Sequence, residues 1–348
     1  MGIVVGIIGV TGYTGQELLR LLFRHPAVTV RHLASLRAEE SKRLGAILPE
    51  FSRQTDLAVS PFKPEEALAG CDLLFFCLPH GEAMKVVPDL LRKKRSLRVV
   101  DLSGDFRLKS AGLFARAYGL RHANAGLLRA AAYGLTEWNR AQIQRSPIVA
   151  NPGCYPTAVL LALAPLAKER LLADGVVVDA KSGVTGAGRA LKEELLFTEV
   201  NEDFRAYKVN DHQHIPEMEQ ELAVLSRKMV GLTFVPHLAP LNRGLYATVY
   251  APLRKKMTEG QVRSLYERAY GGERFVRVLP EGAWPQVKSV ANTNDCEIAI
   301  RMEASGRRVI LLSAIDNLGK GAAGQAVQNM NRMCGLPEEA PWKSSKEG

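Results

Sequence analysis

Residues 3–26, IVVGIIGVTGYTGQELLRLLFRHP, decide the fold that we expect for this chain. The apolar run over residues 3–8 predicts a buried strand, and Gly9, Gly12 and Gly15 follow it at intervals of three. Apolar residues then recur with helical spacing up to the final histidine and proline. A strand, a glycine-rich turn and a helix form a unit suited to a pyrophosphate, because glycines admit close backbone approach and the helix N-terminus offers free N–H groups. Since such a turn can also be purely structural, the next strand has to be considered with it.

The second predicted strand lies in VTVRHLASLRAEE, residues 28–40, and ends near Ser35 and Arg37. A fold that prefers NAD usually places an acidic residue about 20 residues after the glycines, on the ribose hydroxyls. Here a hydroxyl and a guanidinium stand in that region, and both suit a ribose 2′-phosphate. An exposed loop arginine is common, but the combination predicts NADP(H) as the cofactor.

Two later apolar runs continue the alternation of strands and helices. DLLFFCLPHG, residues 72–81, is apolar almost until its proline, as expected for a parallel strand buried on both faces. LRVVDLSGDFR, residues 97–107, predicts another strand. Its end delivers Asp105 and Arg107 to the carboxyl edge of the sheet, where open α/β sheets bind ligands.

The second half of the chain begins with NPGCYPT, residues 151–157. Its prolines and glycine predict a stiff, sharp turn, and the apolar stretch AVLLALAPLAK directly after it predicts a helix. Cys154 is therefore expected at a helix N-terminus, where the pKa of a thiol is lowered and the nucleophilic thiolate is favoured.

Two further segments carry groups of chemical interest. GVVVDAKSGVTGAGR, residues 175–189, predicts a strand and a glycine-rich loop that passes beside a ligand or forms a bulge. AYKVNDHQHIPEMEQEL, residues 206–222, places His212 and His214 before a helix that begins with a proline. No third ligand of matching type stands nearby, so an acid–base role is favoured over a metal site, and an exposed pair of loop histidines stays open as the alternative. Because side chains alternate in an extended segment, only one histidine is expected to face Cys154.

The organisation of the chain follows from its length and its last strand. Residues 309–333, VILLSAIDNLGKGAAGQAVQNMNRM, predict a strand, a glycine-rich loop and a helix that returns to close the first domain. A length of 348 residues favours two domains. We expect an α/β protein with a Rossmann-type NADP-binding domain at 1–150 and 316–348, and an α+β catalytic domain at 151–315.

Composition excludes several classes of protein. The hydrophobic fraction of 47% is ordinary for a globular protein, and the longest apolar runs are too short to span a bilayer. The N-terminal stretch reads as a strand without a preceding basic segment, so a cytoplasmic location is expected.

Five cysteines without C-x-x-C spacing argue against disulfides and structural zinc. The basic residues behind the net charge of +10 are dispersed, which suits an anionic substrate and a phosphorylated cofactor better than nucleic acid.

Eight motifs occur in order over roughly residues 3 to 333. They are GVTGYTG, FFCLPHG, DLSGDFR, NPGCYPT, SGVTGAGR, HQHIPEMEQ, PHLAPLNRG and DNLGKGAAGQAVQNMN. Together they resemble the N-acetyl-gamma-glutamyl-phosphate reductase family of arginine biosynthesis, which is grouped with aspartate-semialdehyde dehydrogenase and is similar in architecture to glyceraldehyde-3-phosphate dehydrogenase. Five positions depart from the usual residues of that family: Gly104, Thr136, Thr185, Gln213 and Gly319. Only the change at Gln213 affects an expected contact, because it removes a usual arginine that could reach phosphate.

The resemblance implies reduction of N-acetyl-L-glutamyl 5-phosphate by NADPH to N-acetyl-L-glutamate 5-semialdehyde and phosphate. Cys154 would attack the acyl phosphate and form a thioester. His212 or His214 would be the acid and base, with a slight preference for His212. Arg107 would bind the substrate phosphate and Arg189 the substrate carboxylate.

The same resemblance implies the cofactor contacts and the assembly. The implied cofactor residues are Gly9, Thr11, Gly12, Tyr13, Thr14, Gly15, Ser35, Arg37, Pro79, Ser182, Gly183 and Asn317. A homodimer or homotetramer would form through the sheet of the second domain, without a nucleic-acid or membrane partner.

Three alternatives stay open at this point. A related enzyme of lysine biosynthesis reduces a carrier-linked amino-adipyl phosphate, and the basic charge would suit its acidic carrier protein, although NPGCYPT differs from what those enzymes tend to have. Aspartate-semialdehyde dehydrogenase is disfavoured by HQHIPEMEQ. A protein that senses NADP or binds nucleic acid on the same fold would have little need of a thiol at a helix start.

Overall fold

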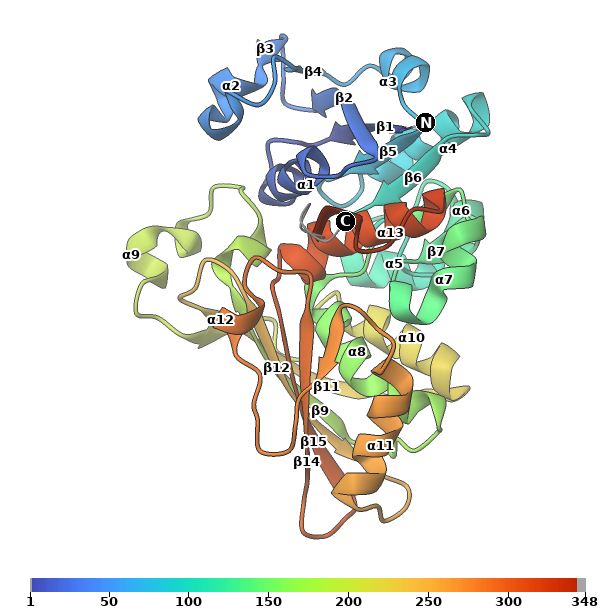
Figure 1. Cartoon of the computed structure of the whole chain (residues 1–348), viewed down its shortest axis with the longest axis vertical. Coiled ribbons are helices and arrows are strands. Elements are labelled where there is room, and N and C mark those ends of the chain that lie inside the picture. The colour runs from blue at the N-terminus through green and yellow to red at the C-terminus, as the bar shows by residue number, and fades with distance from the viewer. Residues whose placement is uncertain (1, 343–348) are drawn as a thin grey trace. The chain divides into compact units, whose positions relative to one another are not determined.

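The computed structural model describes residues 2–342, which fall into two compact units. Unit 1 contains the chain up to Pro152 and again from Ala322 onward, and unit 2 is Gly153–Gly321. The chain therefore changes unit at 152/153 and 321/322, where the sequence predicted 150/151 and 315/316. Figure 1 traces both units by colour along the chain. The expected α/β fold class is confirmed.

Unit 1 is built on an eight-stranded sheet in the order β3-β4-β2-β1-β5-β6-β8-β7. All neighbouring strands are parallel except β3 and β4. The strands are β1 (Ile3–Ile8), β2 (Val28–Ser35), β3 (Lys42–Arg43), β4 (Ala58–Pro61), β5 (Leu73–Phe76), β6 (Arg98–Asp101), β7 (Ala132–Tyr133) and β8 (Ile148–Ala150). The strand order runs outward in both directions from β1, which makes the carboxyl end of β1 the place where such sheets bind ligands.

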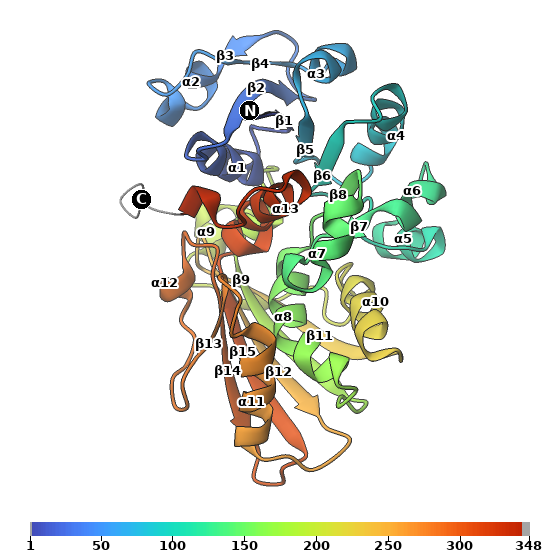
Figure 2. The same cartoon turned by 45° about the vertical axis from the view of Figure 1, so that its right-hand side comes forward.

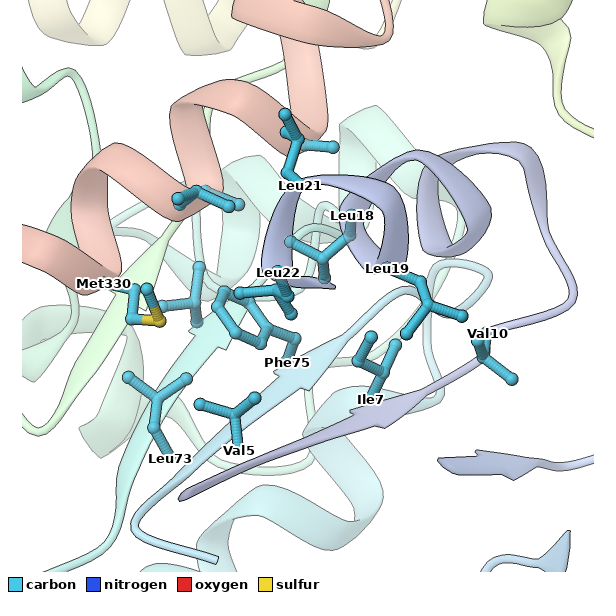
Figure 3. Packing of buried hydrophobic residues seen from close by; sticks show 14 of the residues in the cluster. Val5, Ile7, Val10, Leu18, Leu19, Leu21, Leu22, Leu73, Phe75 and Met330 are labelled. Atoms are coloured by element: carbon cyan, nitrogen blue, oxygen red, sulfur yellow. The ribbon is translucent and has the colours of Figure 1, made fainter. Parts of the chain in front are cut away.

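Helices cover both faces of this sheet. They are α1 (Tyr13–Phe23), α2 (Leu44–Ile47), α3 (Pro64–Gly70), α4 (Ala83–Lys93), α5 (Ala111–Tyr118), α6 (Ala125–Ala130), α7 (Thr136–Arg145) and α13 (Gly324–Cys334). Because side chains alternate along a strand, Ile7 and Phe75 enter the cluster under α1 and α13, whereas Ile8 and Phe76 enter the cluster under α3 and α4. Figure 3 shows the first cluster, with Met330 of α13 beside Phe75. Burial on both faces explains why these strands are continuous apolar runs.

Unit 2 is built on a seven-stranded mixed sheet in the order β10-β11-β9-β12-β15-β14-β13. The strands are β9 (Val176–Gly183), β10 (Arg205–Ala206), β11 (Leu232–Ala239), β12 (Leu245–Pro252), β13 (Val276–Val278), β14 (Cys296–Met302) and β15 (Arg308–Ile315). The helices are α8 (Cys154–Lys168), α9 (Phe197–Val200), α10 (Ile215–Ser226), α11 (Glu259–Tyr270) and α12 (Val287–Val290). Figures 1 and 2 show α8, α10 and α11 on one side of the sheet.

Helix α8 is the centre of unit 2. Its side chains are apolar nearly all round, and every residue from Tyr155 to Ala167 is buried, as expected for a helix enclosed on all sides. Tyr266 and Tyr270 of α11 donate hydrogen bonds to carbonyl oxygens of α8. This packing holds the N-terminus of α8, and therefore Cys154, in a defined place. Across residues 2–342, no helix combines the length and the apolar character that a membrane crossing needs.

Candidate active site

The glycine turn after β1 has the shape that its sequence predicts. Gly9 has φ +94°, and a Cβ added there would lie 2.3 Å from the carbonyl oxygen of Cys77. A Cβ on Gly15 would lie 2.4 Å from the carbonyl oxygen of Gly9, so both positions need glycine for the turn and for close helix packing. Gly12 is the N-cap of α1, which has neither a side-chain cap nor an acidic residue in its first turn. The helix N-terminus is thus available to an anion.

A cavity of about 310 Å³ lies next to this turn within unit 1. Thr11 of the glycine turn lines it together with Ser35, Arg37 and Lys42, so the structure brings together residues that the sequence assigned to the cofactor. The Ser35 hydroxyl accepts a hydrogen bond from the Arg37 backbone N–H at 3.2 Å, and the Arg37 side chain is exposed. Lys42, whose ammonium lies 3.1 Å from a carboxylate oxygen of Glu40, was not predicted.

The loops that follow β5 and β6 are joined by hydrogen bonds. The Asp105 carboxylate accepts the backbone N–H groups of Gly81 at 2.6 Å and Met84 at 2.9 Å, which makes it the cap of α4. His80 accepts the N–H of Gly104 at 2.8 Å through Nδ1. Pro79 is exposed at the carboxyl end of β5, beside β1, where its predicted cofactor contact stays a prediction.

Arg107 is only 4% exposed. Its Nε donates to the carbonyl oxygen of Asn151 at 2.8 Å, and its Nη2 donates to that of Leu102 at 2.9 Å. The guanidinium therefore supports the chain three residues before Cys154. Nearby, burial and the charge of Asp105 raise the pKa of the Asp101 carboxyl to about 7.

Cys154 is the first residue of α8, as the sequence predicts. Gly153 is the N-cap, and α8 has neither a side-chain cap nor an acidic residue in its first turn. Gly321 lies directly against the cysteine, because a Cβ added to Gly321 would stand 2.9 Å from Cys154 Cβ. The thiol is half-buried and forms no disulfide. Cys154 thus stands at the N-terminus of α8, a position that stabilises a thiolate.

Both histidines lie close to this turn, which differs from the expectation that they diverge. Residues 212–215 form a turn rather than an extended segment, since the Ile215 N–H bonds to the His212 carbonyl at 3.0 Å, and the two rings lie 4.6 Å apart. A Cβ added to Gly153 would lie 2.4 Å from His214 Nε2, so the His214 ring abuts the residue before the cysteine.

His212 occupies a more apolar place. Its ring lies 5.7 Å from Tyr155, 5.7 Å from Tyr207 and 5.6 Å from Phe234, measured between ring centroids. Burial first, and then Lys208, lower the pKa of His212 to about 4. Its Nδ1 accepts the backbone N–H of His214 at 3.1 Å, so the neutral ring carries its proton on Nε2. Within residues 2–342, no group of three His, Cys, Asp or Glu side chains is arranged to hold a metal ion.

Sequence reasoning missed Glu217. This side chain is fully buried in the first turn of α10, and its Oε1 accepts the Gly153 N–H at 2.9 Å. The available signal was the interval of three residues between His214 and Glu217, which places both at the start of one helix.

Asn317 ties two loops of unit 2 together. Its side-chain oxygen accepts the Gly244 N–H at 2.7 Å, and its side-chain nitrogen donates to Thr185 Oγ1 at 2.9 Å. The residue is 2% exposed. Both amide atoms are engaged within unit 2, and the predicted contact of Asn317 with the nicotinamide stays a prediction.

The end of β9 is closely covered by its own loop. Ser182 is 3% exposed, and its Oγ lies 3.0 Å from the place of a Cβ on Gly186. A Cβ on Gly183 would lie 2.7 Å from the carbonyl oxygen of Leu241, so glycine is needed for this close approach. Arg189 follows the loop and is exposed.

Comparison with known proteins agrees with this arrangement of two domains. The semialdehyde dehydrogenase NAD binding domain matches residues 4–146, and the semialdehyde dehydrogenase dimerisation domain matches residues 154–317. Among solved structures, aspartate semialdehyde dehydrogenase II of Vibrio cholerae, complexed with ASA, has a TM-score of 0.72 at 19% identity and covers 96% of this chain and 98% of its own. Aspartate semialdehyde dehydrogenase of Candida albicans, with NADP, has a TM-score of 0.69 at 15% identity over 98% and 99% of the two chains. The fold and the two matched domains define an oxidoreductase of the semialdehyde dehydrogenase class, with a nicotinamide-cofactor domain and a dimerisation domain.

Sequence relatives narrow the class. The N-acetyl-gamma-glutamyl-phosphate reductase of Alkalilimnicola ehrlichii is 50% identical over 338 residues, 97% of this chain and 96% of the relative. Those of Laribacter hongkongensis and Pelotomaculum thermopropionicum are 48% and 46% identical, over 96% and 97% of each chain respectively. The chain belongs to the N-acetyl-gamma-glutamyl-phosphate reductase family, which confirms the resemblance found in its motifs.

Proposed function

We propose that this protein reduces N-acetyl-L-glutamyl 5-phosphate to N-acetyl-L-glutamate 5-semialdehyde and phosphate with NADPH, in arginine biosynthesis. The observation that carries the proposal is Cys154 at the N-terminus of α8, with the ring of His214 against the preceding residue. An acyl phosphate is an electrophile that suits a thiolate, and the relatives' names give the acyl group.

The reaction begins at Cys154 Sγ. His214 takes the thiol proton, the thiolate attacks the acyl carbon, and phosphate leaves with the electron pair of the broken C–O bond, which yields a thioester. Bound NADPH supplies the hydride that reduces the acyl carbon. His214 protonates the resulting oxyanion, and takes that proton back as the C–S bond breaks and the aldehyde forms.

The first turn of α8 supplies the oxyanion site in this proposal. The Gly153 N–H bonds to Glu217, Pro156 has no N–H, and the Thr157 N–H bonds to the Gly153 carbonyl at 2.9 Å, so we assign the oxyanion contact to the Tyr155 N–H. Such preorganised donors stabilise the charge that develops on the acyl oxygen.

We assign the acid–base role to His214 and not to His212. Nε2 of His214 lies against Gly153, directly before the nucleophile, whereas His212 is enclosed by Tyr155, Tyr207 and Phe234. A histidine whose pKa is lowered to about 4 is also a weak proton acceptor. His212 orients its neighbour instead, through the hydrogen bond that it accepts from the His214 backbone.

Two arginines are assigned to the anionic ends of the substrate. For Arg107, the support is the match between a guanidinium and phosphate and its hydrogen bond to Asn151, three residues before Cys154. For Arg189, the support is its exposed position after the glycine loop that covers Ser182.

Gly153→Ala is expected to lower kcat by about 10- to 100-fold while thermal stability changes less. The new Cβ would stand 2.4 Å from His214 Nε2 and would displace the ring from the thiol, and misplacement of about 1 Å can cost this much. Gly260→Ala in α11 is the matched control, since nothing lies within 4 Å of its Cβ position. Steady-state rates and thermal unfolding of both variants decide the matter. Unchanged kcat in Gly153→Ala would show that the ring position does not matter.

The preference for NADPH over NADH tests the proposed contact of Arg37 with the 2′-phosphate. Arg37→Ala is expected to weaken NADPH binding by about 1.5–3 kcal/mol, the value of a charge-assisted hydrogen bond, and to leave NADH binding nearly unchanged. The cavity that joins Arg37 to Ser35 and Thr11 supports this choice of NADPH. Arg43→Ala is the control, because Arg43 is exposed and pairs with Asp56 outside the lining of that cavity. Binding titrations with both cofactors measure the effect, and equal losses for NADPH and NADH would refute the 2′-phosphate contact.

We further propose that two copies meet through the sheet of unit 2, as a homodimer or as a half of a homotetramer. The helices α8, α10 and α11 lie on one face of this sheet, and side chains such as Lys181, Tyr246, Thr248 and Leu312 stand half-buried on strands whose alternate residues are fully buried. The cytoplasm is the proposed location.

The reverse reaction tests the proposed function most simply. Oxidation of N-acetylglutamate semialdehyde with NADP⁺ should require inorganic phosphate, because phosphate must cleave the thioester. Oxidation of aspartate semialdehyde alone, or oxidation independent of phosphate, would contradict the proposal.

A further inference from the structure

Glu217 is a buried carboxylate for which the reaction described above has no use. It is fully buried in the first turn of α10, and its Oε1 accepts a hydrogen bond from the Gly153 N–H of the catalytic turn at 2.9 Å. Burying a carboxylate costs free energy unless hydrogen bonds compensate it, so its place beside the nucleophile calls for a physical reason.

His214 and Glu217 contact the same residue from one helix turn. His214 is the N-cap of α10, and Glu217 stands three residues later in its first turn. The Nε2 of His214 lies against the Cα side of Gly153, and Glu217 holds the N–H of the same residue. The position of Gly153 relative to α10 is therefore fixed from two directions.

We propose that Glu217 is the positioning residue that locks the Cys154 turn to the helix start carrying His214, so that nucleophile and base keep one relative position. The inference rests on the proposed function for the role of His214. The charge-assisted hydrogen bond to a backbone N–H is strong and directional, and the N-terminus of α10 favours a carboxylate. Glu217 also keeps the Gly153 N–H away from the substrate, which leaves the oxyanion to the Tyr155 N–H assigned above.

Two variants separate anchoring from other roles. Glu217→Gln removes the charge but keeps a side-chain oxygen that accepts the Gly153 N–H, whereas Glu217→Leu removes the acceptor. We expect Glu217→Leu to lower kcat by about 10- to 100-fold with little change in NADPH affinity, and Glu217→Gln to retain kcat within about threefold. Glu221→Gln is the matched control, a buried glutamate one turn later in α10 whose Oε1 accepts from Gln220.

Alkylation of Cys154 by iodoacetamide gives a readout that a purely structural role would not move. Titratable groups of unit 2 around the thiol and the Gly321 turn behind it are Glu217, His214, His212, Tyr155, Tyr207, Lys320 and Asp316. Removal of one negative charge from this set favours the thiolate, so the pH midpoint of alkylation in Glu217→Gln should fall below that of the wild type. The midpoint in Glu221→Gln should not change.

The outcome is decided by rates, NADPH titration and alkylation profiles on variants whose thermal unfolding is cooperative. Loss of kcat in Glu217→Leu, its retention in Glu217→Gln and a lowered midpoint in Glu217→Gln support the proposal. It is overturned if Glu217→Leu keeps wild-type kcat, if Glu217→Gln loses as much as Glu217→Leu, or if the midpoint in Glu217→Gln does not fall. Alkylation of Cys154 needs no turnover. A wild type without reductase activity would therefore contradict the proposed function, while the alkylation profiles would still test the role of Glu217. If Glu217→Leu does not fold, Glu217→Gln and its midpoint still decide.

Discussion

Cys154→Ser is expected to fold, to bind NADPH as the wild type does, and to lose roughly four to six orders of magnitude in kcat. The half-buried thiol forms no disulfide, so exchange of sulfur for oxygen leaves the packing of α8 intact. A serine hydroxyl is a far weaker nucleophile at neutral pH, and loss of a nucleophile costs this much where the other catalytic groups act only through it. Steady-state rates, NADPH titration and thermal unfolding of the variant measure the three parts of the expectation.

Alkylation identifies the reactive thiol independently of turnover. Burial raises the pKa of Cys71 to about 11 and raises the pKa values of Cys77 and Cys334, while Cys296 is fully buried. Iodoacetamide should therefore modify Cys154 first, and prior incubation with the acyl phosphate should protect it. Cys71→Ser serves as the control and should leave labelling of Cys154 unchanged. A Cys154→Ser enzyme with substantial activity would end the account.

The second large effect is expected for His214→Asn, a loss of roughly 10³-fold in kcat, within the usual range for removal of an acid–base group. The ring abuts Gly153, and asparagine can neither take the thiol proton nor return it. Alkylation of Cys154 should slow as well, because the thiolate loses its proton acceptor. Rates of turnover and of alkylation, measured on the same preparations, give both numbers.

His212→Asn is the matched comparison for that prediction. An asparagine oxygen can still accept the His214 backbone N–H, so kcat should fall by less than about tenfold. A base with the lowered pKa of His212, about 4, would stay deprotonated until the pH approached that value. A large loss in His212→Asn alone, with an acid limb of kcat near pH 4, would transfer the role to His212.

The nucleotide-binding half of the fold could be predicted from sequence because its signals are local. Gly9 and Gly15 must be glycine because a Cβ at either position would clash with backbone atoms, those of Cys77 after the adjacent strand and those of Gly9. The continuous apolar runs reflect burial of the strands on both sheet faces. The join of α13 to unit 1 was also predicted, since a helix that follows a late strand needs a sheet to cover. The sequence did not predict that the chain changes unit at 321/322, because the π-helix Gly319–Ala323 continues across that point into α13.

The sequence predicted the local structure at the candidate site but not the contacts between its segments. The sequence predicted Cys154 at a helix start, yet the expectation that only one histidine faces it depended on an extended segment that is in fact a turn. Glu217 was missed because its contact with Gly153 joins residues 64 positions apart. For the same reason, nothing in the sequence indicated that Asp105 caps α4.

Two departures from the usual family residues have local structural reasons. A Cβ on Gly104 would lie 2.3 Å from the Tyr118 hydroxyl, so glycine makes room for that ring. The hydroxyl of Thr136, a residue fully buried in unit 1, donates to Asn329 at 2.7 Å and accepts from Gln325 at 2.6 Å, which ties α7 to α13. Both changes concern packing within unit 1.

The proposed reaction depends on a thioester between Cys154 and the acyl group. Mass spectrometry after acid quench of the enzyme mixed with N-acetyl-L-glutamyl 5-phosphate, without NADPH, detects this intermediate, because without the hydride it should accumulate. We expect one acyl group on the peptide that contains Cys154, released by hydroxylamine and absent from Cys154→Ser. An enzyme that turns over the acyl phosphate with NADPH, yet shows no adduct or carries the acyl group on another residue, would contradict it.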